Sequence, residues 1–506
     1  MLLPPEPAIL NGGTLPRTSA ENVPTLKIGF VSLGCPKNLV DTEVMMGKLI
    51  SDGHELTPQP SEADVIVVNT CSFIDPAKQE SVDTILEMAE YKKTGKAQRL
   101  VVAGCLVERY RNDIAQNIPE VDAVLGTNEL EKITALCEGM EPKQNPLEPY
   151  LYHDLTARVF TTPRHSAYIK IAEGCDHPCT FCVIPQFRGN FRSRRFESVI
   201  AEATRMFEMG VREINLIGQD TTCYGEDLGL KDGLAQLLAG LARIRTEQAK
   251  WIRFLYAYPN RVTQRLLDTI AEHESLVKYI DIPLQHASAP VLKRMKRGAN
   301  GDIFLKLIEK IRATIPGVAV RTSMIVGFPG ETDQDFDELC AFVKAAQFDR
   351  LGVFSYSDEE TSKSFELDGK IDNRTIYNRK RKLMSLQKQI SRKRNKKLVG
   401  QELAVLVEGP SKETELLWEA RLATQAPEID GVCFINDFGP GEPRVGEMRT
   451  IRISEAHDYD LVGELIDAPE RETAATRSTG NPFVVLPSTS IPKSHPAARI
   501  SSDPRA

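Results

Sequence analysis

Three cysteines within nine residues constrain this chain more than any other feature of its sequence. Residues 174–182 carry them at a C-x3-C-x2-C spacing, and an apolar run at 168–171, typical of a short strand, comes just before. A strand that leads into a compact loop brings three thiolates close enough to hold one iron–sulfur cluster. Most such clusters have four cysteine ligands, and no fourth cysteine lies nearby, so one iron would stay open. The predicted ligands are Cys175, Cys179 and Cys182.

Zinc is the alternative metal for such a loop. Zinc sites usually combine a C-x2-C pair with a second cysteine pair or with histidines. The one histidine near this loop is His177, which lies inside it. The spacing therefore favours an iron–sulfur cluster over zinc or a chance grouping of cysteines.

Length, charge and cysteine content restrict the class of protein. The chain has 506 residues, enough for roughly three domains of about 150 residues each. Its formal net charge of −7 argues against a general nucleic-acid binder. Ten cysteines in a long chain without a secretion signal are typical of metal ligands in a reducing compartment. We therefore expect a cytoplasmic protein.

The two ends of the chain differ in composition from the rest. Residues 1–25 contain five prolines and no continuous apolar core, so we expect a flexible leader there. Residues 467–506 are rich in proline, serine and threonine, which is typical of a disordered tail. No run of about 18 apolar residues occurs, so the sequence predicts no membrane span and no membrane partner.

Strand-like runs alternate with helical patterns between residues 26 and 140. Such alternation predicts a parallel sheet covered by helices. The predicted strands are 27–33, 64–69, 100–103 and 123–125, and the predicted helices are 41–51, 76–91, 107–117 and 129–137.

Three further cysteines follow the first three of these strands. Cys35, Cys71 and Cys105 each lie one or two residues past a strand end, at spacings of about one βα unit. Because ligands collect at the carboxyl ends of parallel strands, these thiols are expected to converge at one sheet edge. The alternative is that they are small buried core residues, as free cysteines often are. Their recurrence in successive units favours a second metal cluster, whereas Cys137, on a predicted helix, is expected to be a core residue.

Residues 161–394 repeat the strand–helix pattern. After 168–171 the predicted strands are 213–217, 252–256, 279–282, 320–326 and 351–354, with predicted helices at 199–209, 233–245, 303–313 and 333–346. Six βα-type units predict a six-unit partial barrel, whose active site would lie at the carboxyl ends of the strands.

At these positions the chain resembles the methylthiotransferase family of the radical S-adenosylmethionine (SAM) superfamily. The cysteine loop, with Phe181 at its aromatic position, is similar to the superfamily signature, and residues 32–38, 69–74 and 103–106 are similar to the family's amino-terminal domain. The resemblance implies an α/β chain of three parts: a parallel α/β sheet domain (26–140) with an auxiliary cluster, a (βα)6 partial-barrel radical SAM core (161–394), and a small β-barrel called TRAM (397–466).

The resemblance also implies the cofactors and the chemistry. They would be two 4Fe–4S clusters and SAM, which Phe181, Gln219, Ile325 and Gly327 would help to hold. An electron given to SAM would yield a 5′-deoxyadenosyl radical, the auxiliary cluster would supply sulfur, and a further SAM would supply the methyl group. The cofactors would perform the hard chemistry while the protein orients them. We also expect an electron donor such as flavodoxin or ferredoxin, and a monomer.

The family has two main branches. One modifies an adenosine of transfer RNA (MiaB-like), and the other modifies an aspartate side chain of the small-subunit ribosomal protein S-twelve. Residues 33–41, 187–194, 255–259 and 356–360 are similar to the second branch. After its first cysteine the transfer-RNA branch usually carries Gln and then Met-Asn, where this chain has Pro36, Lys37 and Asn38. A non-catalytic iron–sulfur protein that binds the ribosome is the third hypothesis.

Charge supplies a separate argument about the substrate. Residues 397–466 contain six basic and fourteen acidic residues, so this domain would repel RNA and attract a basic protein, unless the charge serves only solubility. Residues 374–397 are strongly basic and contain no acidic residue, while Ile376, Leu383 and Ile390 recur every seven residues. This pattern predicts a helix packed by one stripe, whose basic face is either simply solvated or in contact with ribosomal RNA. The basic loop 188–195 is a further candidate for contact with substrate or with the SAM carboxylate.

Overall fold

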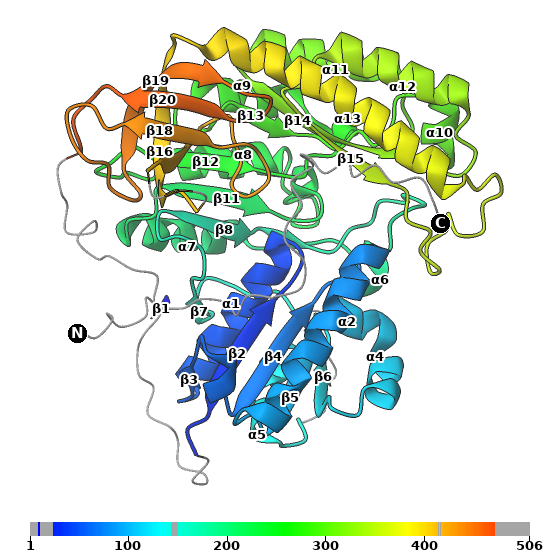
Figure 1. The fold of residues 1–506 in the computed structure, drawn as a ribbon, viewed down its shortest axis with the longest axis vertical. Coiled ribbons are helices and arrows are strands. Elements are labelled where there is room, and N and C mark those ends of the chain that lie inside the picture. Colours follow the sequence, from blue (N-terminus) through cyan, green and yellow to red (C-terminus); the bar gives the residue numbers. More distant parts are fainter. Residues whose placement is uncertain (1–8, 11–23, 143–149, 413, 415, 471–506) are drawn as a thin grey trace, which may run out of the picture.

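Three units are stacked in the computed structural model, which describes residues 9–10, 24–142, 150–412, 414 and 416–470 (Figure 1). The amino-terminal domain, in blue, lies below the green and yellow core, and a small orange barrel packs on the core at the upper left. Most of the predicted leader (1–25) and tail (467–506) lies outside the described residues.

The amino-terminal domain is a five-stranded parallel sheet with the strand order β3-β2-β4-β5-β6. Its strands are β2 (Lys27–Ser32), β3 (Glu55–Leu56), β4 (Val65–Thr70), β5 (Arg99–Gly104) and β6 (Ala123–Leu125). Its helices are α1 (Pro36–Ser51), α2 (Asp75–Ala89), α3 (Tyr91–Thr94), α4 (Cys105–Asn117) and α5 (Ile133–Glu138).

Both faces of this sheet are buried, which explains its continuous apolar strands. On β4, Val65 and Val67 join the cluster under α1, whereas Ile66 and Val68 join the cluster under α2 and α4. The cluster under α1 continues into the core domain, where it includes Tyr168. Helix α1 therefore packs on its own sheet and on the neighbouring domain.

The core is built on six strands in the order β8-β11-β12 and β13-β14-β15, with parallel pairing inside each set of three. A parallel bridge between Ile252 and Leu276 connects the two sets. The strands are β8 (Ser166–Lys170), β11 (Glu213–Ile217), β12 (Trp251–Phe254), β13 (Tyr279–Asp281), β14 (Ala319–Val326) and β15 (Arg350–Ser355). The helices are α7 (Phe196–Glu208), α8 (Gly233–Ala242), α9 (Gln264–Glu272), α10 (Ala289–Arg294), α11 (Gly301–Thr314) and α12 (Asp333–Ala346).

The two faces of the core strands have different chemistry. On β11, Ile214 and Leu216 pack under the helices in the large apolar cluster, while Glu213 and Asn215 point the other way and are also fully buried. Side chains alternate along a strand, so the inner face of the partial barrel is lined by polar groups that need partners. Short elements complete this region: β1 (Ile9–Leu10), β7 (Arg158–Val159), β9 (Ala172–Glu173), β10 (Arg192–Ser193) and α6 (Ile184–Arg188).

The carboxy-terminal unit is a closed barrel of five strands in the order β16-β17-β18-β20-β19. These strands are β16 (Glu402–Pro410), β17 (Trp418–Leu422), β18 (Cys433–Asp437), β19 (Met448–Ala456) and β20 (Leu461–Leu465). All pairs are antiparallel except β18 with β20. Closure leaves no free sheet edge, which is how so small a β unit avoids edge-to-edge association.

One long helix, α13 (Asn373–Asn395), connects the core to this barrel and runs along the top of the core beside α12 (Figure 1). The predicted stripe of Ile376, Leu383 and Ile390 is buried in the core cluster, as expected from its seven-residue spacing.

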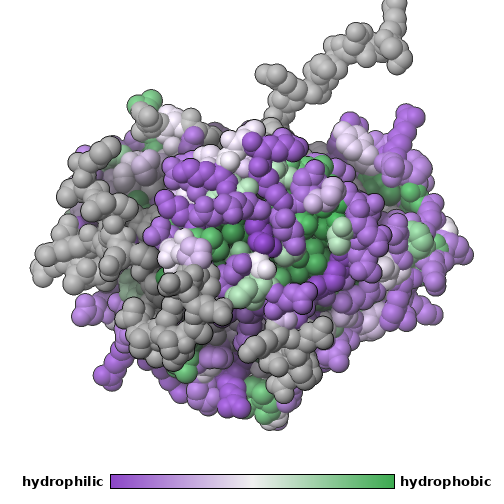
Figure 2. All heavy atoms as spheres, turned by 90° about the horizontal axis from the view of Figure 1, so that it is seen from below, coloured by the Kyte–Doolittle hydropathy of each residue, from purple (hydrophilic) through white to green (hydrophobic). Residues whose placement is uncertain are grey.

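The face seen from below the amino-terminal domain is largely hydrophilic, with hydrophobic side chains in small patches (Figure 2). Among the described residues, no helix combines the length and the apolar character that crossing a membrane requires.

The predicted fold class is confirmed in all three parts. The main local difference is α1, which begins at Pro36 rather than at Asp41. Proline is favoured in the first turn, where its missing N–H would have no intrahelical partner. Residues 36–40 were not predicted as helical.

Candidate metal centres and the charges around them

The ends of three neighbouring strands bring Cys35, Cys71 and Cys105 together. Strand β4 lies between β2 and β5, and Thr70 pairs with Gly104. Cys71 and Cys105 therefore follow paired residues, and Cys35 follows the end of the third strand. All three thiols are close enough to interact electrostatically.

Gly34 makes this close approach feasible. Its φ is +87°, in the left-handed region, and a Cβ at this position would lie 2.9 Å from Sγ of Cys71. Any larger residue would be strained and would push the Cys71 thiol away. Cys35 caps α1 and Cys105 is the first residue of α4. A helix amino terminus carries partial positive charge, and two of the three thiols lie at such a terminus.

The charge of this triad requires compensation. Burial, together with the neighbouring Cys35 and Cys105, raises the pKa of Cys71 to about 12. Burial likewise raises the pKa of Cys105. Metals bind the thiolate form, so a bound metal must supply the positive charge that three buried thiolates need. Three converging sulfur donors without a histidine or carboxylate among them fit an iron–sulfur cluster.

The second triad lies in the loop after β8 and β9. The N–H of Cys175 donates to the carbonyl of Gly189 at 3.1 Å, and that of Cys182 donates to the carbonyl of Cys179 at 3.3 Å. Burial raises the pKa of Cys175 to about 11 and that of Cys182 to about 12. Nη1 of Arg297 lies 3.6 Å from Sγ of Cys179, so one cation already faces this triad. The sequence did not identify Arg297, which comes from the distant segment after α10.

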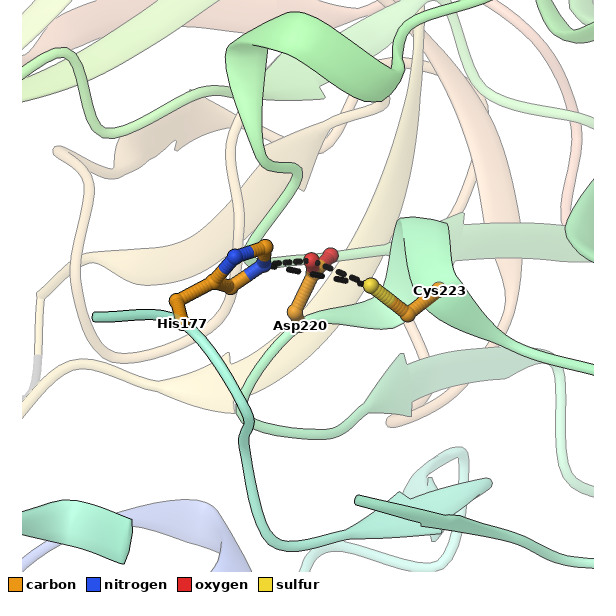
Figure 3. Close-up of side chains that lie close together, drawn as sticks. All are labelled: His177, Asp220 and Cys223. Atoms are coloured by element: carbon orange, nitrogen blue, oxygen red, sulfur yellow. Dashed lines mark hydrogen bonds and ion pairs between the residues drawn. The ribbon is translucent and has the colours of Figure 1, made fainter. Parts of the chain in front are cut away.

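His177 of this loop lies beside a carboxylate, Asp220, and beside Cys223, a thiol that belongs to neither triad (Figure 3). Nε2 of His177 is 2.6 Å from Oδ2 of Asp220, and the Cys223 thiol donates to the same oxygen at 2.9 Å. The His177 ring also stacks on Tyr258, with 3.7 Å between ring centroids. Although burial alone would raise the pKa of Asp220, its hydrogen bonds with His177, Cys223 and Thr222 lower it.

These three side chains could form a metal-binding set, because their ligand atoms lie within 4.8 Å of one another. Burial and Asp220 together raise the pKa of Cys223 far above its usual range, so this thiol is a hydrogen-bond donor. The three side chains already serve as one another's hydrogen-bond partners without a metal ion. It connects the cysteine loop to the segments that follow β11 and β12.

The four residues expected near SAM lie beside the ends of β9, β11 and β14 and in the cysteine loop. Phe181 is half-buried against the core. Nε2 of Gln219 donates to Glu173 at 2.6 Å, while its Oε1 is buried and has no partner. The N–H of Ile325 donates to the carbonyl of Gln285 at 2.7 Å.

Gly327 has a different structural reason for being glycine. A Cβ there would lie 2.3 Å from the Ile376 side chain of α13, and the φ of Gly327 is +81°. Its N–H donates to Glu331 at 2.6 Å. Packing against α13 therefore accounts for this glycine without reference to a ligand.

Arg188 lies between the two triads. Its guanidinium pairs with Asp41 of α1 at 2.5 Å and with Glu173, two residues before Cys175, at 3.3 Å. It also donates to Sγ of Cys105 at 3.4 Å. One buried cation thus contacts one triad directly and is linked to the strand that leads into the other.

This role of Arg188 was missed by the sequence, which grouped it with a basic loop expected to meet substrate or SAM. Arg194 of the same loop is also buried and pairs with Glu202 at 2.5 Å. No sequence signal distinguishes these buried arginines from Arg195, which is exposed. The carboxylates that bind them come from distant segments.

Comparisons with known proteins match the three structural units of the chain to separate families. Residues 27–126 match the uncharacterized protein family UPF0004, residues 169–343 match the radical SAM superfamily, and residues 399–466 match the TRAM domain. A solved structure of the radical S-adenosylmethionine methyltransferase TsrM from Kitasatospora setae is 15% identical, with a TM-score of 0.49 over 65% of this chain and 71% of that chain.

Curated relatives are much more similar. The ribosomal protein uS12 methylthiotransferase RimO of Solibacter usitatus is 75% identical over 445 residues, which cover 88% of this chain and 96% of the relative. The protein of the same name from Koribacter versatilis is 59% identical over 87% of this chain and 96% of its own length. The chain therefore belongs to the RimO family of methylthiotransferases, and it is a radical SAM enzyme whose cofactors are SAM and two 4Fe–4S clusters.

Proposed function

We propose that this enzyme adds a methylthio group to the β-carbon of an aspartate in ribosomal protein uS12, the small-subunit protein S-twelve. The relatives that share most of its length carry that substrate in their name. The observation that carries the proposal is the placement of two cysteine triads on either side of one buried charge network, in which Arg188 contacts Cys105 and pairs with Glu173.

The proposed ligands are Cys35, Cys71 and Cys105 for the auxiliary cluster and Cys175, Cys179 and Cys182 for the core cluster. When bound, the core cluster and SAM supply hydrogen-atom abstraction from an unactivated carbon, and the auxiliary cluster supplies sulfur. Each triad offers three thiols, so one iron of each cluster stays open for SAM or for the transferred sulfur.

The protein itself supplies charge, position and exclusion of water. Arg188 and Arg297 each donate toward a thiol of one triad and so place a positive charge beside it. Gln219 is held by Glu173 and has a buried, unpartnered Oε1 that could accept from a SAM amino group. Phe181, half-buried beside the cysteine loop, would exclude water from that side. We propose Ile325 and Gly327 as further SAM neighbours.

Partners follow from the charges of two elements. The barrel 397–466 has a net formal charge of −8, which suits a basic ribosomal protein. Several basic side chains of α13 are paired with acidic neighbours: Arg379 with Glu331, Lys388 with Asp458 and Arg394 with Asp349. Others, including Lys380, Arg381 and Lys393, are exposed and leave a basic face for ribosomal RNA. We expect a cytoplasmic monomer that receives electrons from a flavodoxin or ferredoxin.

The test uses anaerobically reconstituted enzyme with SAM and a reductant. It is incubated separately with uS12, with uS12 whose target aspartate is replaced by alanine, and with transfer RNA. We expect one methylthio group on wild-type uS12 alone, located by peptide mass spectrometry. A methylthio group on a transfer-RNA nucleoside, or an absence of 5′-deoxyadenosine with every substrate, would overturn the proposal.

A further inference from the structure

Lys37 is a buried cation that has no carboxylate partner among the described residues. Only 9% of its surface is exposed, and its Nζ lies over the ring of Tyr256, 3.4 Å from the ring centroid. Within the described part of the chain no carboxylate forms an ion pair with it. A buried charge normally has a charged or hydrogen-bonding partner, because leaving water is costly. Contact with an aromatic face offsets only part of that cost.

The other buried lysines of the described residues show what is unusual here. Lys170 pairs with Asp41 and, at 2.6 Å, with Glu173. Lys250 donates to the carbonyl of Ile244. Both have a carboxylate or carbonyl partner, whereas the partner of Lys37 is the side chain of Tyr256, which it contacts through the ring and to which it also hydrogen-bonds.

The carboxylates nearest in the fold are already engaged. Asp41, one turn further along α1, pairs with Lys170 and Arg188. Asp281, which holds the backbone N–H of Tyr256 at 3.0 Å, pairs with Arg321 at 2.7 Å. The Cys35 thiol is the acidic group of this domain that interacts electrostatically with Lys37, so a carboxylate that pairs with Lys37 would have to come from another molecule.

The position of Lys37 indicates which molecule that is. It lies in the first turn of α1, two residues after Cys35. Tyr256 lies just after β12, at the end of the partial barrel where the cysteine loop is also found. Its φ is +65°, an unfavourable value for a residue with a side chain, and such strain is often found at functional sites. The pair thus joins the auxiliary triad to the barrel end, where a substrate reached by both centres must lie.

We propose that Nζ of Lys37 binds the carboxylate of the target aspartate and so distinguishes aspartate from asparagine. This inference rests on the proposed function. A lysine ammonium group has three N–H donors, so its contact with the Tyr256 ring does not use all of them and an incoming carboxylate could accept the remainder. The amino terminus of α1 adds partial positive charge at the same place. A carboxylate held there would bring the neighbouring β-carbon to the barrel end at which both triads are found. Lys37 is accordingly a substrate-binding residue that determines specificity.

The experiment measures binding by the cluster-loaded enzyme without reductant, so that no turnover occurs. Two uS12 peptides are compared, one with the target aspartate and one with asparagine in its place. We expect the wild-type enzyme to prefer the aspartate peptide by about 10- to 100-fold, the range for a hydrogen bond to a charged group. Lys37→Gln should remove this preference, and Lys37→Arg should retain part of it.

Controls separate recognition from loss of folding. Lys48→Gln changes a partly exposed lysine of the same helix, paired with Asp52, and should leave the preference unchanged. Iron content and the KM for SAM in peptide-free SAM cleavage are measured for Lys37→Gln as well, so that loss of a cluster is distinguished from loss of substrate recognition.

The possible outcomes are distinguishable. If wild-type enzyme modifies uS12 and Lys37→Gln still prefers the aspartate peptide, the inference is wrong and the proposed function stands. The same holds if the variant loses iron or raises the KM for SAM while keeping that preference, since Lys37 would then compensate cluster charge or bind SAM. If wild-type enzyme neither modifies uS12 nor prefers its aspartate peptide, the proposed function and the inference both fail.

Discussion

Gly34 determines how closely Cys71 can approach the backbone beside Cys35, because glycine has no Cβ. Gly34→Ala should lose the iron of one cluster, because the new methyl group would lie 2.9 Å from Sγ of Cys71. Gly317→Ala is the matched control: its φ of +73° is similarly strained, but nothing lies within 4 Å of the added Cβ. We expect it to cost about 1–2 kcal/mol of stability while both clusters remain. Iron and sulfide content, together with Mössbauer spectra, measures how many clusters each variant retains. Equal iron loss in both variants would attribute the effect to backbone strain alone.

Removing a cysteine from one triad or from the other should affect different steps of the reaction. Cys179→Ala should abolish 5′-deoxyadenosine formation, since SAM cleavage depends on the core cluster. Cys71→Ala should keep some SAM cleavage but yield no methylthiolated product. Cys340→Ala, which removes a buried thiol on α12 far from both triads in the sequence, should change neither activity. Full product from Cys71→Ala would contradict the auxiliary assignment.

Arg188 should tune the auxiliary cluster through its contact with Cys105. Arg188→Gln removes a unit positive charge near the sulfur and should lower the reduction potential, on the order of 100 mV. The reason is that the reduced cluster carries one more negative charge. Arg192→Gln is the control, because Arg192 donates to backbone carbonyls and Asn128 rather than to either triad. Potentiometric titration with EPR detection gives both values, and an unchanged or higher potential in Arg188→Gln would exclude this role.

At the scale of elements, α13 illustrates how one helix serves two purposes. Its heptad-spaced stripe packs on the core, and Leu383 is fully buried. Leu383→Ala should lower the free energy of unfolding by about 2–5 kcal/mol because it leaves a cavity. Lys380→Ala, on the exposed face, should change it by less than about 0.5 kcal/mol. Urea denaturation followed by the fluorescence of Trp251, in the core, tests this. Similar stability of the two variants would mean that α13 is not packed as described.

At the scale of the whole molecule, the polar interior of the partial barrel is completed by the other two domains. The amino-terminal domain meets one end of the strands, where Asp41 pairs with Lys170. The small barrel meets the other end, where Arg421 pairs with Glu213 at 2.5 Å. Glu213 also pairs with Arg253 of β12 at 3.0 Å. Domain docking thus depends on buried ion pairs, which are costly to break by removing one partner.

Glu213 predicts a pH dependence of this docking. Burial alone would raise its pKa, but Arg421 and Arg253 outweigh burial and lower the pKa to about 2, from an ordinary value of 4.5. The stabilisation is therefore present above pH 4.5 and is lost as pH falls toward 2. It amounts to at most about 3 kcal/mol.

Urea denaturation of cluster-free protein checks this, with Trp251 reporting on the core and Trp418 on the small barrel. Glu213→Gln should be less stable than wild type at pH 7, and the difference should shrink as pH falls below 4.5. Asp437→Asn, at an exposed end of β18, should show no such trend. A difference that grows on acidification would mean that Glu213 is not held ionised by its arginines.

Local sequence patterns alone were sufficient to predict several strand limits and the approach of the cysteines. The strands Glu213–Ile217 and Ala123–Leu125 were predicted at their observed ends, because short apolar runs between polar turns set strand limits directly. The recurrence of Cys35, Cys71 and Cys105 after successive strands was sufficient to predict their approach, since parallel βα units repeat at a regular spacing. The spacing of the three cysteines within residues 174–182 likewise predicted an iron–sulfur site, because these residues are close together in the sequence itself.

Tertiary structure decided which charges act together. Lys37, Arg188 and Arg297 look alike in the sequence, yet Lys37 has no carboxylate partner among the described residues, Arg188 links the two triads, and Arg297 faces Cys179. Their partners come from segments tens to hundreds of residues away. A side chain's charge is local information, but its burial and pairing depend on how the domains pack. That is why the cysteine ligands could be proposed from the chain alone, whereas the cations that surround them could not.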